Sequence, residues 1–208
     1  MNREENPQYE LLVTAHDRNG LYGCLNTSVG VVVTINDVND NDPIFEAYLY
    51  NFTVSEDAYI GSSIGSVSAV DNDIGINARL TYSLVGGSGG KFDVDPKNGT
   101  ISVLSKLDRE QNATYLLEIS VTDSGVEILS DYTEVEITLS DFNDNEPKFD
   151  RQLYQTDVEE GLASGTYLFT VTATDSDVGI NGQVLFSTSS DSFQINETTG
   201  DNMLYLIN

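Results

Sequence analysis

A five-residue acidic segment occurs twice in this chain, and it limits the fold more than any other feature. The copies are Asp37-Val38-Asn39-Asp40-Asn41 and Asp141-Phe142-Asn143-Asp144-Asn145, 104 residues apart, each followed by an acid and a proline. Four of the five side chains carry oxygen, so neither copy suits an apolar core. Carboxylates, amide oxygens and backbone carbonyls are the ligands of a hard cation such as Ca2+, which takes about six to eight oxygens. One copy alone could be an Asx-rich turn, but the repetition favours a cation site.

Further acidic and polar positions recur with nearly the same spacing. Pairs that lie 104 residues apart are Asp71 with Asp175, Asp73 with Asp177, Gly75 with Gly179, Asn77 with Asn181, and Glu56 with Glu160. Pairs that lie 106 residues apart are Asn2 with Asp108, Arg3 with Arg109, Glu4 with Glu110, and Asp17 with Asp123. A period this long indicates an array of similar domains rather than a solenoid of short repeats.

Together these motifs resemble the calcium-binding motifs of cadherin repeats. The resemblance covers essentially the whole chain and rests on Glu56, Asp-x-Asn-Asp-Asn, Asp-x-Asp-x-Gly-x-Asn, Asp108-Arg109-Glu110 and the segment around Asp123. It implies an all-β fold of tandem seven-stranded Greek-key, immunoglobulin-like sandwiches, joined end to end by calcium-binding linkers. The expected domains are the C-terminal part of a repeat with its linker (residues 1–41), a complete repeat with its linker (42–145) and the N-terminal part of a third, truncated repeat (146–208).

The resemblance also implies a set of metal ligands at each of two junctions. For the first junction these are Glu4, Asp37, Val38, Asn39, Asp40, Asn41, Asp71, Asp73, Asn77 and Asp123. For the second they are Glu56, Asp108, Glu110, Asp141, Phe142, Asn143, Asp144, Asn145, Asp175, Asp177 and Asn181. Up to three calcium ions per junction are implied. Neither junction is expected to be complete, because the first lacks the Glu of a preceding repeat and has Asn2 in place of an Asp, and the second lacks an Asp expected after residue 208.

The residue types at these positions favour calcium over other metals. Two acids in an extended Asp-x-Asp segment point to the same side, and Gly75 and Gly179 permit a turn that aims a backbone carbonyl inward. Magnesium demands octahedral geometry and keeps its waters. Zinc prefers sulfur and nitrogen ligands, and the chain has one cysteine and one histidine. Close carboxylates repel one another unless a cation offsets their charge.

Alternating apolar residues predict β-strands throughout, and no window keeps a helical period. Residues 1–36 predict two strands, Tyr9–Ala15 and Val29–Ile35, around a turn at Asp17–Gly20. Strand signals of the middle repeat lie at residues 45–54, 64–70, 79–84, 92–94, 101–103, 115–121 and 135–139. The third repeat shows them near Tyr154 and at 168–173, 183–186 and 193–195, and Asp201-Asn202 interrupts the next. Many short, evenly spaced strands favour a sandwich.

Composition excludes several classes of protein. There are 34 acids against nine bases, for a formal charge of −25, and a nucleic-acid binder would need a basic surface. Hydrophobic residues make up 39% and alternate with polar ones, which argues against disorder. No stretch is apolar and long enough to span a membrane, and the first residues lack the apolar core of a signal peptide.

Other candidate sites lack the setting that their chemistry needs. His16 with Cys24 could be a nucleophile pair, paired acids could serve a glycosidase, and Gly86–Gly90 could cradle a phosphate. No cleft or following helix accompanies them, so we expect neither an enzyme nor a small-molecule substrate. The five Asn-x-Ser/Thr sequons suit an extracellular glycoprotein, with Asn98 the best placed: Asn26, Asn51, Asn98, Asn112 and Asn196.

The leading hypothesis is a fragment of a cadherin ectodomain whose calcium-rigidified junctions serve calcium-dependent cell–cell adhesion. The implied partner is another cadherin ectodomain, homophilic or heterophilic, at the extracellular face of the plasma membrane, with the anchor outside this sequence. The chain has no tryptophan and so cannot supply the tryptophan exchange of the best-studied members; its motifs resemble the many-repeat and protocadherin-like branches. Two alternatives are a calcium-stiffened, non-adhesive spacer of a larger surface or secreted protein, and an appended module of a polysaccharide-active enzyme.

Overall fold

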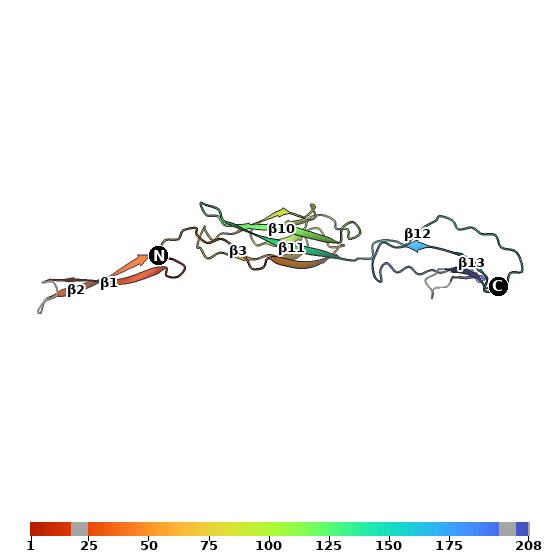
Figure 1. Cartoon of the computed structure of the whole chain (residues 1–208), viewed down its shortest axis with the longest axis horizontal. Helices are drawn as coiled ribbons and strands as arrows, with labels where there is room; N and C mark the ends of the chain where they lie inside the picture. Colours follow the sequence, from red (N-terminus) through yellow and green to blue (C-terminus); the bar gives the residue numbers. More distant parts are fainter. Residues whose placement is uncertain (18–24, 196–202, 208) are drawn as a thin grey trace. The chain divides into compact units, whose positions relative to one another are not determined.

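The computed structural model describes residues 1–17, 25–195 and 203–207, and all their regular structure is β (Figure 1). The chain divides into two compact units. Unit 1 comprises Met1–Phe52, Tyr59–Ser105 and Tyr115–Ile137, and unit 2 comprises Thr53–Ala58, Lys106–Thr114 and Thr138–Asn208. The division into residues 1–41, 42–145 and 146–208 stays a prediction.

Some predicted features lie outside the described residues. These are the turn that follows Asp17, Cys24, the Asn196 sequon and the interruption at Asp201-Asn202. Among the residues that are described, no helix is apolar and long enough to cross a membrane.

The first two strands of unit 1 form an antiparallel hairpin, as predicted. Strand β1 (Gln8–His16) pairs with β2 (Asn26–Thr34). The register sets Tyr9 opposite Val33, Leu11 opposite Val31 and Val13 opposite Val29. These side chains share one face because alternate residues of a strand point the same way, so the hairpin has one continuous apolar face.

The middle of the chain forms two larger sheets and a short strand pair. One sheet has the order β4 (Leu49–Ser55), β11 (Ser130–Ser140), β10 (Thr114–Thr122) and β7 (Thr81–Gly86). The other has the order β5 (Ser63–Ser66), β9 (Thr100–Val103) and β8 (Phe92–Val94). Strand β3 (Ile44–Phe45) pairs with β6 (Ala69–Val70). The last strand, β11, lies beside the early strand β4, which is the Greek-key crossover.

The core of unit 1 lies between these two sheets. Along β11, Val135 and Ile137 are buried whereas Glu134 and Glu136 are exposed. Phe92 of β8 packs edge to face against Tyr115 of β10, with ring centroids 5.0 Å apart. Because these two strands belong to different sheets, the contact shows that the sheets face each other as an immunoglobulin-like sandwich.

The predicted strands at residues 45–54 and 64–70 are each divided in two. The first becomes β3 and β4, and the second becomes β5 and β6. Each break marks a change of partner, since β3 pairs with β6 while β4 joins β11 and β5 joins β9. The nine segments β3 to β11 therefore amount to seven strands, as the fold class requires.

Unit 2 repeats only part of this arrangement. Strand β12 (Lys148–Phe149) pairs with β14 (Ala173–Thr174). A second sheet has the order β13 (Tyr167–Thr170), β16 (Met203–Leu206) and β15 (Phe193–Ile195).

The predicted strands near Tyr154 and at residues 183–186 are wrong, because the structure has no strand at either place. The matching strands of the middle repeat, β4 and β7, pair with β11 and β10. Among the described residues from 146 onward there is no counterpart of β10 or β11, and a strand needs a neighbour to supply its hydrogen bonds.

Candidate metal centres

In unit 1, reciprocal hydrogen bonds hold the linker Asp37–Asn41 against the loop of residues 71–77. We call this set of linker–loop hydrogen bonds a lock. The backbone N and the Nδ2 of Asn41 donate to the Asp73 carboxylate over 3.3 and 2.6 Å. In the other direction, the Ile74 N and the Asn77 Nδ2 donate to Asp37 over 3.1 and 3.0 Å. Asp73 is only 4% exposed. The linker acids are thus held in fixed positions by the chain itself.

The same lock recurs in unit 2 with nearly the same distances. Asn145 donates through its backbone N and its Nδ2 to Asp177, over 3.4 and 2.7 Å. Val178 N and Asn181 Nδ2 donate to Asp141 over 3.2 and 2.9 Å. The repeated sequence motif therefore makes the same hydrogen bonds in both copies.

The turn that each lock needs depends on a glycine. Gly75 and Gly179 have φ angles of 66° and 62°, a region that a residue with a Cβ enters only at a cost. The prediction of a glycine-dependent turn in both acidic loops is confirmed.

Among the residues that the structure describes, three groups of carboxylates are close enough to share a cation. Within each group, one oxygen from every residue lies within 4.8 Å of the others. The groups are Glu4 with Asp37 and Asp73 in unit 1, and in unit 2 Glu56 with Glu110 and Asp141, and Glu110 with Asp144 and Asp177. A set of oxygen atoms alone matches a hard cation such as calcium rather than a soft metal.

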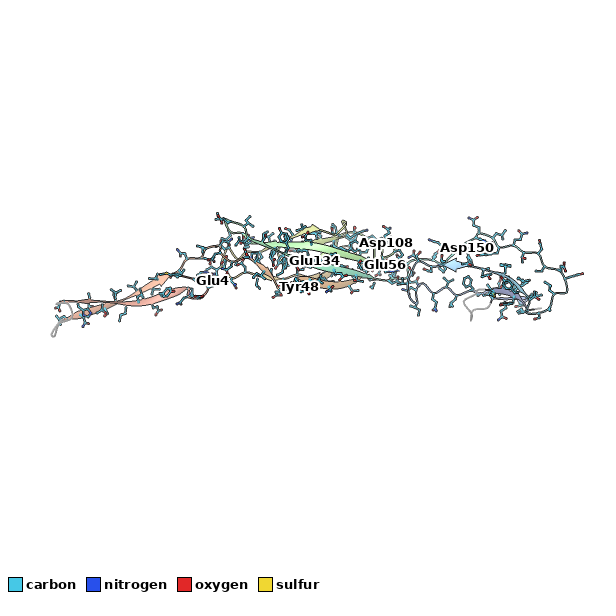
Figure 2. All side chains as sticks on the ribbon, viewed as in Figure 1. Glu4, Tyr48, Glu56, Asp108, Glu134 and Asp150 are labelled. Carbon is cyan, nitrogen blue, oxygen red and sulfur yellow. The ribbon has the colours of Figure 1, made fainter. Side chains whose placement is uncertain are left out.

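Glu56 is the most deeply buried acid among the described residues of unit 2. It is 2% exposed, and its two oxygens accept hydrogen bonds from the backbone N of Arg109 at 2.7 Å and of Phe142 at 2.8 Å. Figure 2 labels Glu56, which follows β4, and Asp108, which immediately precedes the Arg109 amide that Glu56 accepts. Charged hydrogen bonds of this kind are about twice as strong as neutral ones, so the protein fixes this carboxylate without a metal.

Asp123 has a comparable position in unit 1. It is 3% exposed and accepts hydrogen bonds from Gly125 N at 3.1 Å and from Asn39 Nδ2 at 2.7 Å. Asn39 Nδ2 also donates to the carbonyl of Glu127 at 2.7 Å. The Asn39 side chain is therefore held against Asp123 with its amide nitrogen fully used.

Among the described residues of the first junction, three oxygen atoms are buried and accept no hydrogen bond: Asp37 Oδ1, which contacts Arg3, and Asn39 Oδ1 and Asp71 Oδ2, which have no such ion-pair contact. Buried acceptors without a partner are costly and call for one. A cation is such a partner, so the donor set of the first junction fits the calcium that the motifs imply.

Two arginines belong to the junctions, although the sequence interpretation did not select them. Arg3 pairs with Glu4 at 2.5 Å, contacts Asp37 and donates to the Asn72 carbonyl at 2.7 Å. Arg109 pairs with Glu110, with Asp141 at 2.6 Å, and donates to the Ser176 carbonyl. Both side chains are nearly buried. The available signal was their recurrence 106 residues apart, between the paired acidic positions.

The pKa values of the acids diverge within these clusters. Burial disfavours ionisation of Asp37, yet bonds from the Ile74 amide, Asn77 and Arg3 outweigh it and lower the pKa. The pKa of Asp141 is lowered in the same way, against burial, by Asn181, the Val178 amide and Arg109.

The opposite shift occurs at two other acids. Burial, together with repulsion from Asp73, Asp123 and Asp37, raises the pKa of Asp71. Burial and the nearby Glu56 raise the pKa of Glu110. Acids that resist ionisation beside fixed anions lie where a cation would relieve the most repulsion.

Several predicted ligands lie outside the three carboxylate groups. The Asp108 carboxylate accepts hydrogen bonds from the N and Nε2 of Gln111, at 2.9 and 2.7 Å, and so caps a turn. Asp40 accepts from Asn41, Asp175 accepts from the Asp177 amide, and Asn143 is exposed. The carbonyl of Val38 accepts the Asp40 amide at 3.0 Å. Their roles as ligands, and that of the Phe142 carbonyl, stay predictions.

Comparison with known proteins identifies the type of domain. The profile of the cadherin domain matches residues 50–140. Mouse cadherin EGF LAG seven-pass G-type receptor 1 is 41% identical over 180 residues, which cover 86% of this chain and 6% of that protein. Human protocadherin Fat 1 is 37% identical over 203 residues, which cover 96% of this chain and 4% of that protein. The chain thus spans only about a twentieth of these relatives' length.

Solved structures show the same likeness in three dimensions. A crystal structure of human CDH23 EC21-23 superimposes with a TM-score of 0.82 at 30% identity, covering 99% of this chain and 69% of that chain. Mouse cadherin-23 EC22-24 gives the same TM-score at 33% identity, covering 99% of this chain and 66% of that chain.

Proposed function

The chain belongs to the cadherin family, and from that premise we propose that its two junctions bind calcium ions, which stiffen a tandem array of repeats used in cell–cell adhesion. One observation carries the calcium part of this proposal. The junction in unit 1 combines a fixed carboxylate group with two buried oxygens, Asn39 Oδ1 and Asp71 Oδ2, that accept no hydrogen bond.

The chain's own residues would do three things around the ions. The reciprocal bonds between linker and loop hold the carboxylates in place before any ion binds. Arg3 and Arg109 each add one fixed positive charge. The remaining repulsion between close carboxylates, about 4 kcal/mol for a pair near a protein surface, is what bound calcium would remove. Stiffening then follows, because ions tie the linker to its neighbouring loops.

The predicted ligands would be shared among up to three ions at each junction. The inner ion of the first junction would take Asn39, Asp71, Asp73, Asp123 and the carbonyls of Asn41 and Asn77. Its ligands all lie in unit 1, so this site does not depend on residues outside the chain.

The biological role is proposed from the relatives. The cadherin repeats matched by this chain belong to adhesion proteins rather than enzymes, which supports the expectation of a non-catalytic chain and disfavours the polysaccharide-enzyme alternative. We place the chain outside the cell, at the plasma membrane, with another cadherin ectodomain as partner. The comparisons do not favour the non-adhesive spacer.

The test is a calcium titration of the 208-residue chain, followed by thermal melts with excess calcium and with chelator. Calcium at a hundred times its dissociation constant should stabilise the native state by about 2.7 kcal/mol, which raises the melting midpoint by about ten degrees for a domain of this size. Asp73→Ala should abolish most of that rise.

The matched control is Glu136→Ala. It removes the same charge from an exposed position of β11, outside every carboxylate group, and should leave the calcium-dependent rise intact. Equal melts with calcium and with chelator, in the unmodified chain, would overturn the proposal.

A further inference from the structure

Arg109 contacts every member of one carboxylate group in unit 2. Its Nη2 pairs with Glu110 and lies 2.6 Å from Asp141 Oδ1, and its Nε lies 3.9 Å from Glu56 Oε1. The arginine side chain is 13% exposed. The same three acids have oxygens within 4.8 Å of one another, and we call them the arginine-filled group. The guanidinium makes the contacts that a cation bound by this group would make.

The other carboxylate group of unit 2 has a different environment. It consists of Glu110, Asp144 and Asp177, and we call it the open group. The Nζ of Lys106 lies 4.0 Å from Asp144 Oδ2, and this lysine side chain is 83% exposed. Exposed ion pairs contribute little, because water and salt screen them. The chain therefore compensates the negative charge of the open group less well than that of the arginine-filled group.

Arg3 repeats this placement in unit 1. It contacts Glu4 and Asp37, two of the three acids of the carboxylate group there. It also donates to the carbonyl of Asn72 at 2.7 Å, as Arg109 donates to the carbonyl of the residue 104 positions further on. Because the same contacts occur in both units, the position of the arginine follows from the repeated fold.

The arginine is an incomplete substitute for a metal ion. A guanidinium presents five N–H donors in a fixed plane, and the Nε of Arg109 is buried without a hydrogen-bond partner. It brings one positive charge to three carboxylates. Calcium brings two charges and accepts oxygens in a flexible geometry. The arginine should therefore reduce the repulsion within its group and still leave the group able to bind calcium.

We propose that Arg109 is a built-in counter-ion that competes with calcium for the arginine-filled group. Without calcium it holds Glu56, Glu110 and Asp141 together. When calcium enters, the ion either shares these carboxylates with the guanidinium charge or displaces it, and both events lower the calcium affinity. The open group should then fill first as calcium rises, and the arginine-filled group later. This inference rests on the proposed function, since it concerns the order in which the junction takes up calcium.

The test is Arg109→Gln in the 208-residue chain, which keeps a polar side chain and removes the charge. In chelator, the midpoint of denaturant unfolding should fall, because three close carboxylates lose their cation. In a calorimetric calcium titration, the affected site should bind several-fold more tightly, so that one ion moves from the weak to the tight class while the total number stays the same. An arginine with a purely structural role would instead lower both the stability and the calcium affinity.

Two further variants separate charge from shape. Lys106→Gln removes the same charge from the exposed base beside the open group, so both quantities should change little, and any change should vanish at high salt. Arg109→Lys keeps the charge but replaces the planar fork with a point donor. It should keep the calcium affinity of the unmodified chain, while its stability in chelator falls part of the way.

The outcomes distinguish this inference from the proposed function. If the unmodified chain binds calcium and Arg109→Gln binds it equally or more weakly, the counter-ion role is overturned and the calcium sites stand. Equal stability of these two chains in chelator would also overturn it. An unmodified chain that takes up no calcium would overturn the proposed function, and the competition with it. Arg3→Gln repeats the test at Glu4 and Asp37, so the result does not depend on the folding of one variant.

Discussion

Among the described residues, both junctions have the same lock, but a buried acid closes the inner end of the first and the outer end of the second. In unit 1, Asp123 and Asn39 close the inner end, and two oxygens there accept no hydrogen bond. In unit 2, Glu56 closes the outer end with two backbone amides, while Asn143, the counterpart of Asn39, is exposed. The middle repeat supplies both Asp123 and Glu56, so a single repeat contributes a different half to each junction.

The two ends differ in what satisfies their oxygen atoms: the chain's own hydrogen-bond donors at one end and, on our proposal, a bound cation at the other. Glu56 accepts two backbone hydrogen bonds and faces Arg109, so the chain's own groups satisfy this carboxylate. Asn39 Oδ1 and Asp71 Oδ2 accept no hydrogen bond, and the partner proposed for them is the ion. Substitutions at the two ends should therefore differ in whether calcium changes their effect.

The largest effect is expected at Glu56. Glu56→Ala leaves Arg109 nearly buried with one carboxylate fewer and two backbone amides without an acceptor, and breaking a buried charged pair costs about 3 kcal/mol. The loss should appear in chelator as well as in calcium, as a lower midpoint in denaturant unfolding.

Glu160→Ala is the matched control for Glu56, since Glu160 occupies the same sequence position in the third repeat but is exposed. It should change stability by less than about 0.5 kcal/mol. If the two variants unfold alike, Glu56 is not the fixed end of the second junction.

The inner end should respond only when calcium is present. Asp123→Ala removes a ligand of the inner ion and releases Asn39, so the chain should lose most of the roughly 2.7 kcal/mol that excess calcium provides. The measurement is the calcium stoichiometry by calorimetry, which should fall by one.

Asp95→Ala tests whether loss of a loop-capping acid explains that result. Asp95 accepts the Lys97 amide at 2.8 Å, much as Asp123 accepts Gly125, but unlike Asp123 it is not one of the predicted calcium ligands. Its calcium stoichiometry should be unchanged. An equal drop in both variants would contradict the inner site.

A smaller effect is expected from a substitution that crowds the Asn39 side chain and leaves every acidic residue in place. A Cβ at Gly125 would lie 2.4 Å from the Asn39 side chain, which is held by two hydrogen bonds and cannot swing away freely. Gly125→Ala should cost about 1 kcal/mol and weaken the inner ion several-fold. Gly86→Ala, where a Cβ meets nothing within 4 Å, should leave calcium affinity unchanged, and similar affinities in both variants would count against the position of Asn39.

Much of this comparison could be predicted from the sequence, because the calcium motifs are short, local and repeated. The locks at Asp37 and Asp141 each join two short segments that are 32 to 40 residues apart, but each segment carries its own recognisable motif, and glycines at the turn fix the loop geometry. The hairpin β1–β2 could be predicted equally well, since alternation of apolar and polar residues indicates a β-strand directly.

Features that depend on partners far along the chain could not be predicted in this way. The alternation of apolar and polar residues continues through Glu46–Tyr48, although the strand changes its partner there. The same alternation persists near Tyr154, where no partner strand is described. The roles of Arg3 and Arg109 were missed because the sequence interpretation searched for oxygen ligands and not for basic side chains that pair with them.

The smallest expected effect lies at the outermost position, where the two junctions differ by one residue. The first has Asn2, whose Oδ1 accepts the Glu4 amide at 2.9 Å, and the second has Asp108. Asn2→Asp adds a charge at an exposed position, which is worth less than about 1 kcal/mol and is screened by salt. Calcium affinity of the first junction should rise a few-fold at low ionic strength, and Asp108→Asn should lower that of the second by a similar factor. An effect of Asn2→Asp that equals that of Asp123→Ala, or that survives high salt, would mean that the outer position is as enclosed as the inner one and that the comparison drawn from burial is wrong.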